Sequence, residues 1–324
     1  MKIKGIITAR DYEKWPNWDL IYEWEDVIAK ELDISLIHEK KIAYNKYVVK
    51  VPYLAGLLQT SVPSFKFDMT PTRRLFNSNN KKTIVPCIVD FFLKDTLALK
   101  KFYKRYDRHP VVLISSREVY EYLKDHDCPL RIIHFPLSIS DKYKIKPETL
   151  YEKTYDMVLM GRQNPILEEY VKRYAAEHPL FYYVYRVQKN GVFNYYTSKG
   201  EYLGDINSRE KYMSLMRKAR IGLYSTPGID GGEKRTNGFN QVTPRFLELI
   251  ACGCHIIARY PDNADTRFYK LSDFCPSMNR YEDFKKAVES ALSCDVNMEA
   301  YSEYLSSHYT SMRCRQLQEI INQI

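Results

Sequence analysis

The chain has 324 residues, of which 45% are hydrophobic and 14% aromatic, and its formal net charge is +9. This length and apolar content suit about two domains, each with its own core. No stretch approaches the roughly 20 apolar residues of a membrane span, and residues 1–15 lack the apolar run of a signal peptide. The seven cysteines include no C-x-x-C pair. We therefore expect a cytoplasmic protein in which Cys252 and Cys254 are small core residues.

The first half of the chain reads as alternating strands and helices. Short runs rich in β-branched residues predict strands, and apolar residues at helical spacing predict the helices between them. The expected elements are a strand within 2–9, a helix over 18–32, and then strand 84–89, strand 111–114, helix 116–125 and strand 131–134.

Most of the excess positive charge lies in residues 51–110, which hold 11 Lys and Arg against 4 Asp and Glu. Such a region suits a nucleic acid, an anionic lipid or a phosphorylated substrate. A solvated surface that aids solubility explains it equally well. Composition alone leaves these alternatives open.

The second half repeats the alternation. The expected elements are strand 156–160, helix 165–177, strand 180–188, helix 208–220 capped by Ser208, strand 221–226, helix 244–251, strand 255–259, helix 280–293 and a helical tail over 297–324. Alternation in both halves predicts two α/β domains with parallel sheets. The polar stretch 138–155 places the boundary between domains 1–145 and 146–324.

The segment TPRFLELIACGCHIIARY (243–260) combines a short helix and a buried strand with charged residues. Thr243 is a candidate helix cap, and Pro244 suits the first helical position. Gly253 suits the end of the helix. Arg245 and Glu248 lie one turn apart, either as an exposed pair or as parts of a site. In doubly wound folds a helix N-terminus at the carboxyl edge of the sheet favours a phosphate.

The run RFLELIACGCHIIAR resembles a segment of the GT-B glycosyltransferases of the group 1 type, and its Arg-x-x-Glu form resembles their spore-maturation-protein-like branch. The resemblance implies a GT-B fold, with two Rossmann-like doubly wound domains facing a central cleft. The N-terminal domain would bind the acceptor and the C-terminal domain the donor, and the last helix would pack back on the N-terminal domain. Glu248 matches the residue that binds the ribose in that family.

Two further segments fit this resemblance. YDMVLMGRQNP resembles the strand that ends in Gly161 and Arg162, where Arg binds the donor diphosphate. The family's lysine five residues later is Leu167 here, so a second cation must come from Lys234, Arg235 or Arg245. The family pattern Glu-x7-Glu has Asn240 in place of its first Glu, which removes a charge expected near the donor sugar.

The resemblance therefore implies a set of site residues. The expected donor-binding residues are Gly161, Arg162, Asn240, Gln241, Thr243, Arg245 and Glu248. The expected catalytic residues are Asp90, Arg162 and Arg245. PCIVDFF (86–92) resembles the family strand that ends in His-Asp, so Asp90 is a candidate acceptor base; a turn or helix-cap role is the alternative.

The implied activity is transfer of a sugar from a nucleotide-sugar donor to a polysaccharide, glycolipid or glycan acceptor. Arginines and a helix N-terminus would stabilise the leaving diphosphate without a metal or cofactor, and the sequence shows neither Asp-x-Asp nor a His/Cys cluster of metal spacing. The basic region suits an anionic membrane on the cytoplasmic side, whereas no nucleic-acid-binding motif accompanies it. The alternative is a non-catalytic GT-B-like protein that binds a sugar nucleotide or a partner.

Overall fold

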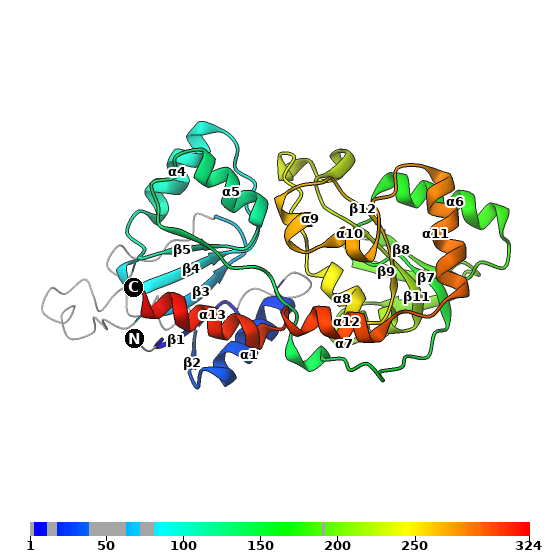
Figure 1. The fold of residues 1–324 in the computed structure, drawn as a ribbon, viewed down its shortest axis with the longest axis horizontal. Coiled ribbons are helices and arrows are strands. Elements are labelled where there is room, and N and C mark those ends of the chain that lie inside the picture. The colour runs from blue at the N-terminus through cyan, green and yellow to red at the C-terminus, as the bar shows by residue number, and fades with distance from the viewer. Residues whose placement is uncertain (1–2, 12–17, 39–62, 72–80, 190–191) are drawn as a thin grey trace, which may run out of the picture. The chain divides into compact units, whose positions relative to one another are not determined.

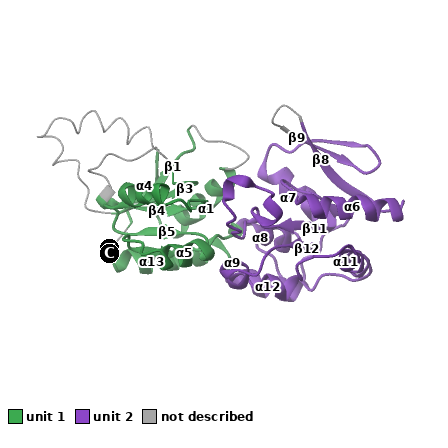
Figure 2. Cartoon of the chain, turned by 90° about the horizontal axis from the view of Figure 1, so that it is seen from above, with its two compact units in different colours: residues 1–141, 308–324 green, residues 142–307 purple. Residues whose placement is uncertain are grey.

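The computed structural model describes residues 3–11, 18–38, 63–71, 81–189 and 192–324. These residues form two compact units, shown in different colours in Figure 2. Unit 1 consists of residues 1–141 together with 308–324, and unit 2 consists of residues 142–307.

Unit 1 is built on a six-stranded parallel sheet with the strand order β2-β1-β3-β4-β5-β6. Figure 1 shows helices on both faces of this sheet, which makes it doubly wound. Its elements are β1 (Gly5–Thr8), α1 (Asp19–Glu31), β2 (Ser35–His38), β3 (Ser64–Asp68), η1 (Lys81–Thr83), β4 (Ile84–Ile88), α4 (Thr96–Tyr106), β5 (Val112–Ile114), α5 (Arg117–Asp125), β6 (Ile132–His134) and α13 (Thr310–Asn322).

Helix α13 completes the core of unit 1 although it lies far from the other elements in sequence. It packs beside α1 on one face of the sheet, and its Leu317 and Ile321 share a buried cluster with Trp24 and Phe65. The chain returns through a short parallel bridge between Ile139 and Tyr309.

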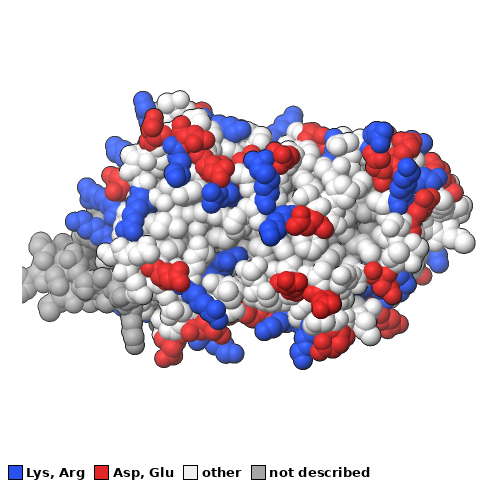
Figure 3. Space-filling model, viewed as in Figure 1, with Lys and Arg blue, Asp and Glu red and all other residues white. Residues whose placement is uncertain are grey.

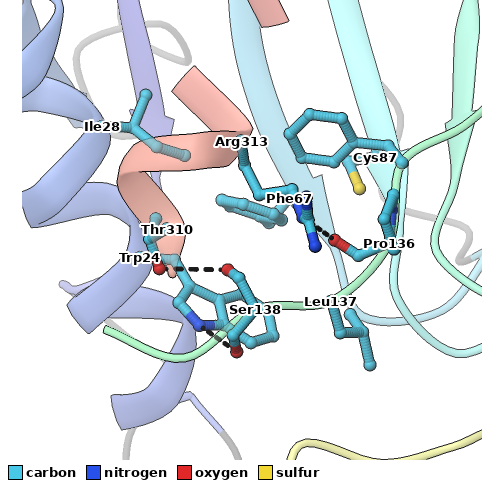
Figure 4. A pocket seen from close by; sticks show the side chains of 10 residues that line it. Trp24, Ile28, Phe67, Cys87, Pro136, Leu137, Ser138, Thr310 and Arg313 are labelled. Carbon is cyan, nitrogen blue, oxygen red and sulfur yellow. Dashed lines mark hydrogen bonds between the residues drawn. The ribbon is translucent and has the colours of Figure 1, made fainter. Parts of the chain in front are cut away.

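Polar side chains around a small cavity join α13 to the rest of unit 1 by hydrogen bonds (Figure 4). Trp24 donates from its indole Nε1 to the carbonyl of Ser138 at 3.0 Å. The hydroxyls of Ser138 and Thr310 lie 3.0 Å apart, and Arg313 donates from Nε to the carbonyl of Pro136 at 3.0 Å. Arg313 is buried, so these contacts fix the position of α13 in unit 1.

Unit 2 also contains a six-stranded sheet, with the order β10-β9-β8-β7-β11-β12. Its elements, after the short segment η2 (Asp141–Tyr143), are β7 (Tyr155–Val158), α6 (Pro165–Glu177), β8 (Tyr183–Lys189), β9 (Val192–Thr197), β10 (Tyr202–Asp205), α7 (Arg209–Arg217), β11 (Ala219–Ser225), η3 (Ile229–Gly231), η4 (Lys234–Thr236), α8 (Arg245–Ala251), β12 (His255–Arg259), α9 (Ala264–Phe268), α10 (Leu271–Phe274), α11 (Tyr281–Ser293) and α12 (Met298–Ser306).

The sheet of unit 2 is mixed, so the prediction of a wholly parallel second sheet is wrong in this detail. β7, β8, β11 and β12 pair in parallel, whereas β8, β9 and β10 form an antiparallel meander. The physical reason is the length of the connections. Only a few residues join β8 to β9 and β9 to β10, and a parallel crossover needs a dozen or more.

Helices cover both faces of the parallel part of this sheet. Leu167 and Val171 of α6 and Phe284 of α11 pack against Ile221 and Leu223 of β11. The other face of β11 receives α8. A Cβ at Gly222 would lie 2.2 Å from a methyl carbon of Leu249, so the glycine allows α8 to approach closely.

The predicted basic region 51–110 is described only in part, because residues 51–62 and 72–80 lie outside the described residues. In the described part, Lys100, Lys101 and Lys104 are exposed on α4, whereas Lys66 is buried in an ion pair with Asp68 at 3.3 Å. Figure 3 shows basic and acidic side chains interspersed over the face that it draws. None of the helices among the described residues is long and apolar enough to cross a bilayer.

Candidate functional site

The site is built on the turn that follows β7 in unit 2. Gly161 lies at the carboxyl end of this strand with φ +60°, a conformation that favours glycine. A Cβ at this position would lie 2.3 Å from Nη2 of Arg245, so a side chain would displace that guanidinium. Both the conformation and the space therefore require glycine at the turn.

Arg245, the first residue of α8, contacts this turn. Its Nη1 donates to the carbonyl of Arg162 at 2.8 Å and its Nε donates to the hydroxyl of Tyr212 at 3.3 Å. Burial raises the pKa of Tyr212 to about 12, so its hydroxyl stays neutral and able to accept this bond. The structure thus brings together Gly161, Arg162 and Arg245, which the sequence placed in one site.

A third guanidinium, that of Arg186 in β8, lies at the same turn. Its Nε donates to the carbonyl of Gly161, and its guanidinium carbon lies 4.3 Å from the ring centroid of Phe193. Burial holds the pKa of Arg186 below its usual range, and the nearby Arg245 and Arg162 act in the same direction. This residue was not among those predicted from the sequence, although a lone arginine in the aromatic strand YVYRVQK was a signal.

One carboxylate balances this group of arginines. Arg162 makes an ion pair through Nη1 with Oε2 of Glu233, and the same oxygen lies 3.4 Å from Nε of Arg235. Within the described ranges, no carboxylate lies at ion-pair distance from Arg186 or Arg245. Three guanidinium groups therefore share one turn with a single paired carboxylate, an arrangement that favours an anionic ligand.

The loop before α8 is tied to the same turn. Asp230 accepts from Nδ2 of Asn164 at 2.7 Å and makes a two-point ion pair with Arg259, with N–O distances of 2.5 and 2.8 Å. Asn164 also caps α6 through Ile166 N, so the loop is attached to the start of that helix. Lys234, one of the predicted second cations, is exposed on this loop.

Asn240, Gln241 and Thr243 lie in the polar segment that leads into α8. Asn240 is buried; its Oδ1 accepts from the hydroxyl of Thr226 at 2.9 Å and its Nδ2 donates to Gly238 O at 3.0 Å. Gln241 is buried as well. The backbone N–H of Thr243 donates to the hydroxyl of Tyr224 at 3.0 Å.

The predicted cap of α8 is wrong. The helix begins at Arg245, and Pro244 occupies the capping position with helical dihedral angles and no side-chain cap. Thr243 therefore lies one residue too early to cap the helix. The other end agrees with prediction, since Gly253 follows the helix with φ +59°.

Glu248 lies on the buried side of α8. Only 3% of it is exposed, and its Oε1 lies 2.8 Å from Nη2 of Arg209, the first residue of α7. Arg209 is itself buried. The alternative of an exposed Arg245–Glu248 pair is therefore wrong, and the ribose contact of Glu248 stays a prediction.

Asp90 belongs to unit 1, where it follows β4 at the carboxyl edge of the sheet. It is partly exposed, and its backbone N–H donates to the carbonyl of Met69 at 2.6 Å. Ser115, at the end of the neighbouring β5, donates from its hydroxyl to the carbonyl of Val89 at 2.6 Å. Asp90 thus lies at the edge where parallel sheets bind ligands. In the part of the chain that is described, no group of His, Cys, Asp and Glu side chains is arranged to hold a metal.

Comparison with known proteins gives matches at the level of structure. No protein-family profile and no curated protein sequence matches the chain. A glycosyltransferase from Rickettsia africae ESF-5 is similar with a TM-score of 0.52 at 10% identity, over 91% of this chain and 86% of its own. The GtfA/B complex and the pneumococcal O-GlcNAc transferase GtfA in complex with UDP and GlcNAc each give a TM-score of 0.50, at 10% and 11% identity, over 84% of this chain.

These similarities define the fold. The two mostly parallel six-stranded sheets and the similar structures give the chain the GT-B fold that the sequence predicted. Identity near 10% shows the fold alone. The chain spans 59% of the length of each of the two GtfA-containing matches.

Proposed function

We propose that the chain is a glycosyltransferase that moves a sugar from a nucleotide-sugar donor to a glycan, polysaccharide or glycolipid acceptor. The observation that carries this proposal is the cluster of Arg162, Arg186 and Arg245 at the Gly161 turn, at the carboxyl end of a parallel strand in a GT-B fold. Ligands of open α/β sheets bind at this edge. The similarity to a transferase whose structure holds UDP and GlcNAc supports a nucleotide-sugar donor.

The chemistry of sugar transfer requires positive charge at such a place. When the bond between the anomeric carbon and the donor phosphate breaks, negative charge develops on the leaving diphosphate. Guanidinium groups held in position stabilise that charge, and their two-point hydrogen bonds orient the phosphate. On this proposal the arginines stabilise the leaving group without a metal, Glu248 contributes to ribose binding, and Asp90 in unit 1 accepts the proton of the acceptor hydroxyl.

Titration calorimetry with a panel of sugar nucleotides tests the donor site. We expect the wild type to bind at least one member of the panel. Replacing the partly exposed Arg162 by methionine should weaken that binding at least tenfold, because one charge on the diphosphate is lost. Arg280→Met is a matched control, since this exposed arginine pairs with Asp283 in α11 of the same unit. Failure of every sugar nucleotide to bind would refute the proposal.

Asn240 favours a second function, binding of a sugar nucleotide without transfer. It stands where the family that the sequence resembles carries a carboxylate, and its amide is buried and holds the loop to Thr226. Slow release of the nucleotide diphosphate from a bound donor separates the two functions. A transferase should transfer the sugar to water at a measurable rate, whereas a binding protein should leave the donor intact.

A further inference from the structure

We propose that Arg186, and not Arg245, is the second cation that binds the donor diphosphate beside Arg162. This inference rests on the proposed function, because it assigns residues within that donor site. It assigns Arg245 a different role, that of a positioning residue that holds the Gly161 turn in place.

The contacts of the two arginines differ. Arg245 donates from Nη1 to the carbonyl of Arg162 and from Nε to Tyr212, and its Nη2 occupies the space that a Cβ at position 161 would need. Its nitrogens are thus directed at the protein. Arg186 has one described hydrogen bond, from Nε to the carbonyl of Gly161, which leaves its two terminal nitrogens for a ligand.

The residues around Arg186 hold its guanidinium in one orientation. The centroid of the Phe193 ring lies 4.3 Å from the guanidinium carbon, a distance at which cation–π attraction holds the guanidinium over the ring. The Nε bond to Gly161 fixes the rotation of the group over this ring. A guanidinium held in this way loses little entropy when it binds a phosphate, so it is suited to bind a diphosphate tightly.

The antiparallel meander explains how Arg186 reaches the turn. Arg186 of β8 pairs directly with Tyr195 of β9, and the hydroxyl of Tyr195 accepts from the N–H of Gly161 at 3.4 Å. The two paired residues therefore bind the carbonyl and the amide of the same glycine. The meander therefore brings both Arg186 and Tyr195 to the Gly161 turn.

Binding of inorganic pyrophosphate, measured by titration calorimetry, tests this assignment without knowledge of the sugar or base. Arg186→Met should lower the affinity at least tenfold. Arg186→Lys, which keeps the charge but lacks the planar fork of N–H donors, should lose less affinity than Arg186→Met. Orthophosphate, with one phosphate group to bind, should lose less affinity than pyrophosphate in Arg186→Met. Arg173→Met is the matched control, because Arg173 also lies over an aromatic ring of unit 2, at 3.7 Å from the centroid of Tyr281.

Each result decides the inference. Equal losses in Arg186→Met and Arg186→Lys would overturn it, because Arg186 would then act only through its bond to Gly161. Unchanged affinity in Arg186→Met would also overturn it. If sugar nucleotides bind in a way that depends on Arg162 while Arg186→Met behaves as the wild type, only this inference fails. If neither sugar nucleotides nor pyrophosphate bind to the wild type, the proposed function fails with it. Thermal melts show whether each variant is folded. If Arg186→Met does not fold, the affinity of Arg186→Lys tests the inference.

Discussion

The buried pair of Glu248 and Arg209 allows a quantitative prediction about stability. The side chain of Glu248 is 4% exposed and that of Arg209 is 9% exposed, and their nearest charged atoms lie 2.8 Å apart. Removing one member of such a pair takes the nearest opposite charge away from a buried charged group, at a cost of about 3–5 kcal/mol. We therefore expect Glu248→Leu and Arg209→Met each to destabilise unit 2 by about 3 kcal/mol.

Differential scanning calorimetry measures this effect. For a unit of the size of residues 142–307, each kcal/mol lowers the melting temperature by about 2–4 °C, so each single variant should melt about 6–12 °C below the wild type. The double variant Glu248→Leu/Arg209→Met removes both charges and should be more stable than the sum of the single effects implies, with a coupling of about 2 kcal/mol. Additive losses, or shifts below about 2 °C in the single variants, would refute the reasoning.

This prediction affects how binding data are interpreted. A variant of Glu248 that fails to bind a sugar nucleotide loses stability in α8 as well as any contact to the ribose. The partly exposed Arg162 is a cleaner probe of the donor site for this reason.

Three further predictions concern other residues of the two units. Glu233→Gln frees Arg162 from its ion pair, so pyrophosphate should bind about fivefold more tightly in calorimetry, whereas weaker binding would mean that Glu233 orients Arg162 for the ligand. Gly161→Ala places a side chain in the left-handed region and against Arg245. Thermal melts should show that the free energy of unfolding falls by about 1–2 kcal/mol, and calorimetric titration should show at least a tenfold loss of pyrophosphate affinity. Unchanged stability and affinity would contradict the site geometry. Burial raises the pKa of Glu25 from 4.5 to about 7. Between pH 4.5 and pH 7 the folded protein therefore keeps a proton on Glu25 that the unfolded chain has lost. The free energy of unfolding should fall by about 3 kcal/mol as the pH rises from about 4.5 to above 7. Glu25→Gln should remove this part of the pH dependence in denaturant melts, and a profile identical to that of the wild type would count against it.

Elements with clear periodicity were predicted well from the sequence. The helix predicted over 165–177 is α6 (Pro165–Glu177), and the strand predicted over 255–259 is β12 (His255–Arg259). The cap of α7 at Ser208 is confirmed, since its hydroxyl accepts from Lys211 N at 3.3 Å. In these segments the apolar pattern and the end signals agree, so local sequence is enough.

Elements with charged or tyrosine-rich sequences were missed. All five residues of β3 (Ser64–Asp68) are buried, but the charged Lys66 and Asp68 interrupt the apolar pattern of the sequence. Their ion pair at 3.3 Å allows both to be buried. Helix α4 was interpreted only as a basic stretch. The strands β9 and β10 continue a tyrosine-rich sequence, in which the alternation of buried and exposed residues is weak.

The candidate site was predictable only where the chain carries a motif. Gly161, Arg162 and Arg245 stand in segments that resemble known ones, and the structure brings them to one turn. Arg186 reaches this turn through the register of an antiparallel pair, and Arg209 reaches Glu248 from another helix. Such pairings depend on tertiary packing, which a single sequence does not display.

The return of α13 to unit 1 has a consequence for biosynthesis. Residues 142–307 are continuous and hold all the strands of the second sheet, so this unit can fold as soon as it has left the ribosome. The first unit waits for residues 308–324, since Leu317 and Ile321 cover Phe65 and its neighbours in the core. The strands of unit 1 are translated before those of unit 2, yet the part of their apolar face that α13 covers stays open to chaperones until α13 has been made.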